Sequence, residues 1–593
     1  MKPDLQTIKR KTMKMQSYIV KKHYLLLISM LVLAFSSCER ENDILKEVPL
    51  DFLAPENAYT TVPGIQQGIA GLHSYNRDNW WFETWVRSGN IGSGSGDIIW
   101  WNIATDLSYY GEDPGSALGM ADYTVNLTST NSNVSSCWSQ NYSMIQKANV
   151  LIKAINDSDA EIWPSEAKRN AYLAEAMFFR AFSYRILVSY FGDVPLVKDV
   201  ITTPKTDFVR APKAEIYKLM EDDLTFAAAN LPRRGQEEQP GRITQGAAWH
   251  YLCETYLCEG KYQLAVDAAT HVINDYGYAL MTNRFGTRLA KDIWGAGDPF
   301  YDLFGYGNQN LAANTESIWV IQIEPLIPGG ALNSGERAFG PAYFRWGNTP
   351  DGKTAFRGDL VAGKYTGYTD SLGRGVGWVR CTNYAAYNIW ASDWDNDIRN
   401  AKHNIKRDYY FDNPASAYHG QKVSSKLYPA GTRNLYKDST NYIFPFWTKF
   451  GDPFNHFIYA TQAGNGYTHK DIYALRLPET LLLRAEAYVR LNNLPAAADD
   501  INVIRSRAHA TPVSPSDVTL DYILDEYARE LYGETMRSIV LRRMDKLVER
   551  VSLYNDNPAL PGGNIKPHHK LWPIPQTVID LNIDAVLEQN PGY

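Results

Sequence analysis

The chain has 593 residues, of which 45% are hydrophobic and 21% charged, a composition that excludes an intrinsically disordered protein and allows one to three domains. The net charge is −6, and because residues 1–37 hold seven basic groups and one acidic group, their removal leaves −12. An acidic chain argues against nucleic acid as a partner, and we expect none. Aromatic residues reach 13%, with 16 Trp and 39 Tyr, and flat aromatic faces stack on partners such as sugar rings.

The N-terminus has the pattern of a targeting segment. Basic residues precede an apolar run at 24–35, which is too short to span a bilayer and has the length of a signal-peptide core. The segment ends Ala34-Phe35-Ser36-Ser37-Cys38, with small residues before a cysteine, which resembles the cleavage box of a bacterial lipoprotein. We predict a lipoprotein signal peptide at 1–37, lipidation of Cys38 and a tether at 38–57. An ordinary secretory signal, and a start at Met13 or Met15, are the alternatives.

Helical periodicity follows the tether through the first half of the chain. Predicted helices cover residues 62–76, 135–156, 166–190 and 211–231, followed by a helical hairpin at 244–276 that Gly260 divides. The apolar spacing of this hairpin is similar to that of a tetratricopeptide repeat. Since such hairpins do not recur at a fixed interval along the chain, we expect large insertions between them.

The first insertion, residues 77–133, is irregular and rich in glycine and aromatic residues. A loop of this length cannot bury all its aromatic side chains, which makes it a candidate binding surface. The candidate ligand-contacting residues here are Trp80, Trp81, Trp100, Trp101 and Asn102. Core packing is the alternative for each ring, because one member of an adjacent pair in an extended segment points inward.

The second insertion, residues 283–470, is expected to be mostly loops, with one strand at 317–323. It supplies two further candidate ligand-contacting residues, Trp346 and Trp378. Residues 393–397 carry carboxylates at alternate positions, as a calcium-binding loop does. Ile398 and Asn404, however, stand where that loop needs glycine and an acidic residue. The calcium signal is therefore weak.

Two amphipathic helices are predicted over 471–508, with Leu475 and Leu482 on the first and a turn at Asn492-Asn493. Pro478 and Pro495 fit the first turn of each helix, where no N–H is needed. A further single helix is expected over 520–551. Its charged residues are interpreted as scaffold ion pairs with one another: Glu526, Glu530, Glu534, Arg537, Arg542 and Arg543.

No motif indicates catalysis, a metal or a cofactor, and we expect none. The sequence has neither H-E-x-x-H nor G-x-S-x-G, and the adjacent His568 and His569 do not share a helix face. Spacing alone does not test for the paired carboxylates of a glycoside hydrolase. The remaining cysteines follow no disulfide or zinc pattern and are interpreted as buried small hydrophobic residues: Cys137, Cys253, Cys258 and Cys381.

Taken in order, several segments resemble the SusD/RagB family of Bacteroidetes outer-membrane nutrient-uptake lipoproteins. They are AEAMFFRAFSYRILVSYFGDVPLV (174–197), ALRLPETLLLRAEAY (474–488), INVIRSRA (501–508), E-x2-R-E-L (526–531), WPIPQ (572–576) and the terminal QNPGY (589–593). The acidic residues Glu39, Glu41 and Asp43 resemble the surface-export signal of lipoproteins in this phylum.

The resemblance implies a mostly α fold: a tetratricopeptide-like array of about four helix pairs with a large, irregular, loop-rich ligand-binding lobe. The SusD-like domain would cover 58–593, with the scaffold mainly at 58–76, 135–276 and 471–551. The resemblance also implies an ion pair between Asp397 and Arg399.

The implied role is capture of an oligosaccharide or polysaccharide at the outer surface of the outer membrane, where the lipid anchor holds the protein. The implied partner is a SusC-like TonB-dependent transporter, which would meet the helical face and receive the ligand uncleaved. Two alternatives stay open: uptake of peptides by the same route, as in RagB-like relatives, and a glycan-active enzyme.

Overall fold

A computed structural model describes residues 58–80, 102–112, 120–289, 292, 295–325, 327, 330–456 and 466–593, except the side chains of 79 and 80. Within it, Ile65–Tyr593 forms one compact unit, and this unit is described below. The predicted mostly helical, tetratricopeptide-like fold is confirmed.

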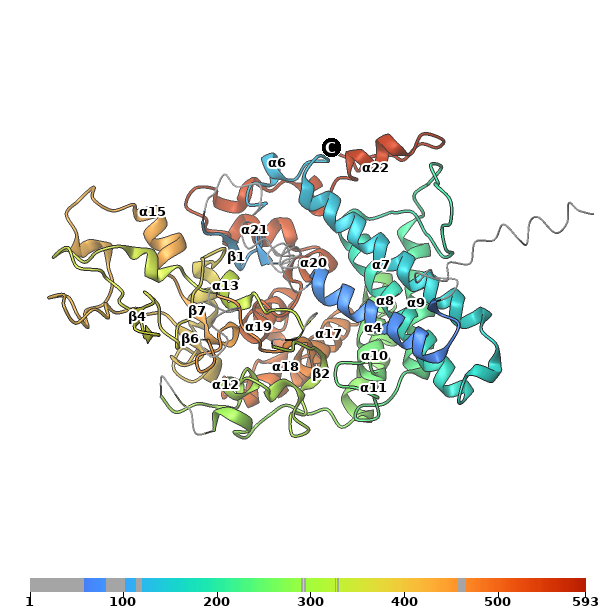
Figure 1. Cartoon of the computed structure of the whole chain (residues 1–593), viewed down its shortest axis with the longest axis horizontal. Coiled ribbons are helices and arrows are strands. Elements are labelled where there is room, and N and C mark those ends of the chain that lie inside the picture. The colour runs from blue at the N-terminus through green and yellow to red at the C-terminus, as the bar shows by residue number, and fades with distance from the viewer. Residues whose placement is uncertain are drawn as a thin grey trace, which may run out of the picture. The chain divides into compact units, whose positions relative to one another are not determined.

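The scaffold is a row of helices, each packed on the next (Figure 1). Its members are α7 (Ser132–Asp157), α8 (Glu166–Phe191), α9 (Lys213–Asn230), α10 (Gln245–Glu259), α11 (Tyr262–Asp275), α17 (Leu477–Arg490) and α18 (Leu494–Arg507). Helix α4 (Val62–Trp80) precedes them in the chain. Since α11 packs directly on α17, the long segment between them leaves the row and returns to it.

Local signals set the ends of these helices. The Ser165 hydroxyl accepts a hydrogen bond from the Lys168 amide at 3.1 Å and caps α8. Gly260 takes the left-handed conformation, with φ of 77°, and turns the chain between α10 and α11. Pro478 and Pro495 lie in the first turns of α17 and α18, as predicted.

Small side chains let α10, α11 and α17 pack closely. Their shared core is built from Cys253, Leu257, Ala265, Val266, Ala268, Ala269, Leu483 and Ala487. Of the free cysteines, Cys258 is only half-buried, whereas the other three in the described residues are buried as predicted.

Two predictions for the C-terminal half were wrong. Ile472–Arg476 is not helical but forms strand β8, which pairs antiparallel with β2 (Ser317–Ile321), so that Tyr473 lies opposite Val320. The segment 520–551 is not one helix but three, α19 (Leu520–Leu531), α20 (Arg537–Arg543) and α21 (Leu547–Tyr554). Gly533, with φ of 71°, interrupts it where the rings of Phe339 and Phe450 leave no room for a side chain.

The second insertion consists of loops and short elements, as predicted. These are α12 (Pro299–Leu303), α13 (Gly335–Phe339), α14 (Asn383–Ala386), α15 (Leu435–Lys437) and the paired strands β3 (Leu360–Val361) with β4 (Lys364–Tyr365) and β6 (Ile405–Lys406) with β7 (Phe446–Trp447). Figure 1 shows α15, β4, β6 and β7 away from the row α8–α11. The insertion has a separate core that includes Tyr343, Phe356 and Phe411.

The first insertion, residues 77–133, is called the early loop region below. It joins the second insertion through a pair of strands. Strand β1 (Ser108–Tyr110) pairs antiparallel with β5 (Val379–Cys381). The two remaining short helices, α6 (Tyr123–Asn126) and α22 (Gln576–Leu581), lie after β1 and near the C-terminus.

A buried ion-pair network attaches the insertion to α19. Arg399 binds Asp397 at 2.7 Å, which confirms that predicted pair, and it also donates to Glu526 at 2.8 Å and Glu530 at 3.0 Å. Burial disfavours the charged form of Glu526, yet its arginine neighbours overcome this and lower its pKa to about 2. The loop that carries Arg399 is therefore held by charge pairs that water does not screen.

The predicted partners of the α20 arginines were wrong, although their scaffold role was right for two of them. Arg537 pairs with Asp106 at 2.5 Å, and Arg543 pairs with Glu254 at 3.0 Å and Glu486 at 2.8 Å. Arg542 has no carboxylate partner among the described residues and donates to the carbonyl oxygen of Lys570 instead. Because the helix breaks after α19, the spacing of one continuous helix does not decide which charged residues lie together.

Candidate functional site

Most of the early-loop predictions fall outside the described residues. The residues that the structure does not describe include Trp81, Trp100 and Trp101, and also the predicted lipidation site Cys38. The side chain of Trp80 is not described either, although its backbone ends α4. Their assignments as lipidation and ligand-contacting residues stay predictions.

The other three predicted contact residues are buried. Asn102 is 4% exposed, and its carbonyl oxygen accepts the hydroxyl of Thr105 at 2.7 Å. Trp346 is 3% exposed, donates its indole N–H to the Tyr428 hydroxyl at 2.8 Å and belongs to the core of the insertion. Trp378 is 8% exposed. None of the three presents an open face, and their contact with a ligand stays a prediction.

The structure brings the early loop region and the second insertion together at Glu112. The amide of Gly111 donates to the carbonyl oxygen of Trp378 at 3.0 Å, which extends the β1–β5 pairing by one step. A side chain at position 111 would overlap the carbonyl oxygens of Thr440 and Gly377, so this approach requires glycine. Glu112 is thereby placed beside the indole of Trp378.

The carboxylate of Glu112 collects hydrogen bonds from both zones. It accepts the indole N–H of Trp378 at 2.9 Å and a guanidinium N–H of Arg345 at 3.1 Å. The side chains of Glu112 and Arg345 are 35% and 39% exposed, so this pair lies at the surface. We call the surface around this pair the Glu112 junction; its members are Glu112, Arg337, Phe344, Arg345, Arg374 and Trp378.

Arginines and aromatic rings alternate across the Glu112 junction. The guanidinium carbon of Arg337 lies 4.8 Å from the Trp378 ring centroid. Those of Arg345 and Arg374 lie 5.8 and 5.2 Å from the ring of Phe344. Burial, and then the nearby charge of Arg337, lower the pKa of Arg374. The junction thus offers guanidinium donors to hydroxyl or carboxylate oxygens, beside the partly buried ring of Phe344.

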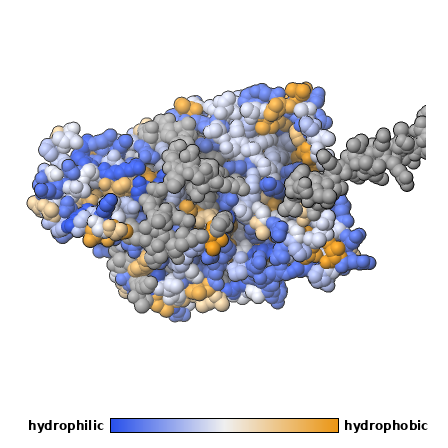
Figure 2. Space-filling model, in the orientation of Figure 1, coloured by the Kyte–Doolittle hydropathy of each residue, from blue (hydrophilic) through white to orange (hydrophobic). Residues whose placement is uncertain are grey.

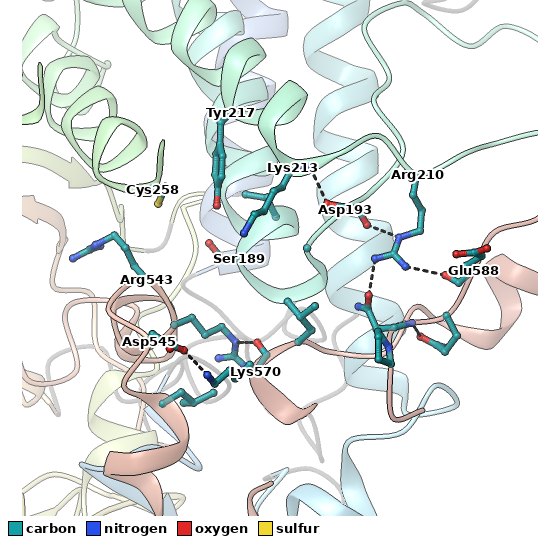
Figure 3. A pocket seen from close by; sticks show the side chains of 18 residues that line it. Ser189, Asp193, Arg210, Lys213, Tyr217, Cys258, Arg543, Asp545, Lys570 and Glu588 are labelled. Atoms are coloured by element: carbon teal, nitrogen blue, oxygen red, sulfur yellow. Dashed lines mark hydrogen bonds and ion pairs between the residues drawn. The ribbon is translucent and has the colours of Figure 1, made fainter. Parts of the chain in front are cut away.

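A separate pocket of about 480 Å³ lies where α8, α9 and α20 meet the C-terminal segment (Figure 3). Two of its cations join neighbouring segments: Arg210 donates to the carbonyl oxygens of Asp193 and Glu588, and Lys570 pairs with Asp545 at 2.6 Å. These bonds tie the C-terminal segment to the helices, so the pocket is explained by packing.

The residues weighed for catalysis or metal binding have structural partners. His569 accepts the Lys566 amide at 2.9 Å and stacks on Tyr123, and burial lowers its pKa to about 4. Asp393, in the segment compared with a calcium loop, binds Arg505 at 2.7 Å and Thr511. The described residues contain no group of three or more His, Cys, Asp or Glu side chains that could hold a metal.

Sequence reasoning missed one exposed tryptophan, Trp394. Among tryptophans whose side chains are described, it is the exposed one, at 43%. Its sequence neighbours Asp393, Asp395 and Asn396 are all polar, and a tryptophan between polar loop residues could have signalled a ring that faces solvent.

Comparisons with known proteins point to one family. A family model described as the SusD family matches residues 371–593, and one described as starch-binding associating with outer membrane matches 101–257. Two relatives from Formosa agariphila are SusD-like protein P25, 25% identical, and SusD-like protein P2, 27% identical. The alignments cover 98% and 96% of this chain and 100% of each relative.

Solved structures share the fold. Surface glycan-binding protein A from Bacteroides thetaiotaomicron in complex with laminarihexaose aligns with a TM-score of 0.64 at 20% identity. A laminarin-binding SusD-like protein aligns with a TM-score of 0.62 at 21% identity. Both alignments cover 90% of this chain and 100% of the other. In the part of the chain that the structure describes, no helix is long and apolar enough to cross a bilayer.

Proposed function

Because the chain belongs to the SusD family, we propose that it captures an oligosaccharide or polysaccharide at the outer surface of the outer membrane and delivers it uncleaved to a SusC-like TonB-dependent transporter. The lipoprotein-like N-terminus supports the location. Relatives of the same fold whose names include laminarin and laminarihexaose support the ligand class.

The observation that carries the proposal is the Glu112 junction. It gathers hydrogen-bonding groups and aromatic rings from the early loop region and the second insertion, which is the chemistry that sugar recognition needs. The binding role, rather than cleavage, is supported by the partners of Glu112, the carboxylate among the described members of the junction. Glu112 is already hydrogen-bonded to Trp378 and Arg345, whereas glycoside hydrolysis uses two carboxyl groups on either side of the scissile bond.

An exposed apolar surface supports a protein partner. Leu581, Ile583 and Val586 are exposed near the C-terminus, and Val209 is exposed on a neighbouring loop. The amide of Asp584 donates to the Thr206 carbonyl at 2.9 Å and joins these two segments. Figure 2 shows apolar residues gathered over α22 at the upper edge of the view. Such surfaces mark protein interfaces.

Isothermal titration of the purified protein with laminarin, amylopectin and alginate, and with a mixed peptide digest, tests the ligand class. Arg345→Ala removes a guanidinium, and Trp378→Phe removes only the N–H that Glu112 accepts. We expect Arg345→Ala to weaken glycan affinity about tenfold, the effect of losing one charged hydrogen bond. Trp378→Phe should weaken it less, because the bond that it removes positions Glu112 within the protein. Arg490→Ala, a partly exposed arginine on α17, is the matched control and should bind as the wild type does.

Binding of peptides with no binding of any polysaccharide would refute the glycan half of the proposal. Glycan binding that neither junction variant weakens would refute the Glu112 junction as the site. Release of shorter sugars from a bound polysaccharide would refute capture without cleavage.

A further inference from the structure

Two exposed aromatic rings lie together in the second insertion, outside the Glu112 junction. Trp394 is 43% exposed and Tyr387 39%. Their ring centroids are 6.3 Å apart and their planes differ by only 13°, so the two rings are close neighbours and nearly parallel. Apolar side chains scattered singly on a surface are ordinary, whereas two parallel rings exposed side by side are not.

The pair is supported from the protein side by Arg407. Its guanidinium carbon lies 4.7 Å from the Trp394 ring centroid and 5.6 Å from that of Tyr387. The same guanidinium donates to the carbonyl oxygen of Ala386 at 2.7 Å and to the side chain of Asn400 at 2.6 Å. Arg407 is thus anchored in the protein and holds both rings in place.

The loop that carries the rings is pinned at three further points. The side chain of Asn400 donates to the Trp394 carbonyl oxygen at 2.6 Å. Asp393 binds Arg505 of α18 at 2.7 Å, and the buried Asp397–Arg399 pair binds α19. A platform fixed in this way loses little conformational freedom when a ligand binds, which favours affinity.

Polar residues lie next to both rings in the chain. Asn388, Asp395 and Asn396 are exposed, and their side chains make no hydrogen bond to another described residue. On the Tyr387 side, the ion pair of Asp408 with Lys422 is also exposed, at 2.5 Å between charged atoms. Exposed aromatic rings with amide and carboxylate groups nearby in the chain suit the apolar face of a pyranose ring and its equatorial hydroxyls.

We propose that Tyr387 and Trp394 form a second glycan-binding platform that shares no residue with the Glu112 junction. The inference rests on the proposed function for the class of ligand, but not on where the first site lies. Two sites on one chain bind a long polysaccharide more tightly than either alone, because the second contact is intramolecular. The platform therefore acts on polysaccharides more than on short oligosaccharides.

Affinity electrophoresis in native gels that contain laminarin, amylopectin or alginate tests the platform. Trp394→Ala and Tyr387→Ala should each weaken retardation by the bound polysaccharide at least about fivefold, and Trp394→Phe should restore most of it. Tyr365→Ala, which removes another exposed aromatic ring of the insertion, is the matched control. Since Trp394 is exposed, the variants should melt at the wild-type temperature.

The double variant Trp394→Ala/Arg345→Ala separates the two sites. If the two sites bind independently, the double variant should lose more retardation in the gel than either single variant does. If Arg345→Ala weakens binding while Trp394→Ala and Tyr387→Ala leave it unchanged, the platform is refuted and the proposed function stands. If Trp394→Ala instead reduces only co-purification with the transporter, the occupant is a protein and the platform inference is again refuted. A wild type that no polysaccharide retards refutes both.

Discussion

Replacing Arg399 with methionine should destabilise the protein strongly, because it leaves one buried carboxylate without a cation. Asp397 is fully buried, and among the described residues its cationic partner is Arg399, at 2.7 and 2.9 Å. The other two acceptors keep partners: Glu526 retains Arg505 and Arg529, and Glu530 retains Arg476 and Arg507. The damage is therefore centred on Asp397.

Removing one partner of a buried ion pair costs about 3–5 kcal/mol, and we expect Arg399→Met to lower the free energy of unfolding by that amount. Methionine fills much of the space, so loss of packing adds little. The double variant Asp397→Asn/Arg399→Met removes the unpaired charge as well and should recover at least about 1 kcal/mol of the loss.

Urea unfolding followed by circular dichroism measures both variants, provided that the m-values agree with the wild type. A loss below about 1 kcal/mol for Arg399→Met would contradict the reasoning. So would a double variant that is less stable than the single one, because the cost would then arise from packing and not from charge.

Four further predictions concern pH, the junction, the anchor and the partner. Glu526 and Glu254 have pKa values lowered to about 2, below the unfolded value, so their stabilisation is complete above about pH 5 and is lost as the pH falls towards 2. Calorimetry should show the melting temperature falling over that range, and a constant value down to pH 3 would contradict this. Gly111→Ala should weaken glycan binding and cost about 1–3 kcal/mol of stability, measured by titration and urea unfolding, because its Cβ overlaps two carbonyl oxygens. Cys38→Ala should move the protein from the membrane fraction to the soluble fraction in immunoblots, and wild-type levels in the membrane would count against lipidation. Ile583→Asp should reduce co-purification with the transporter at unchanged glycan affinity, and unchanged co-purification would exclude this surface.

Much of the helical scaffold could be predicted from the sequence, because its signals are local. The periodicity of apolar residues, the turn at Gly260 and the prolines at 478 and 495 act within a few residues of where they stand. The helix ends therefore agree closely with prediction for α8, α10 and α11.

The errors arose where a distant segment decides the local conformation. Residues 472–476 carry apolar side chains that suit a helix or a strand, and they form β8 because β2 lies beside them. Arg537 lies on a helix close to predicted glutamate partners, yet it binds Asp106, which the early loop region brings to it. The spacing of residues along the chain does not predict either of these contacts.

The family resemblance, and with it the expected ligand class, could be recognised from the sequence, because the resemblance lies in scaffold segments that follow one another in the order typical of the family. Which aromatic rings face solvent was decided only by tertiary structure. Trp346 and Trp378 are covered by the folded insertion, whereas Trp394 is held outward by Arg407 and by the buried pairs of Asp393 and Asp397. A tryptophan has the same chemistry in the core and on the surface, so its exposure depends on what the rest of the chain places against it.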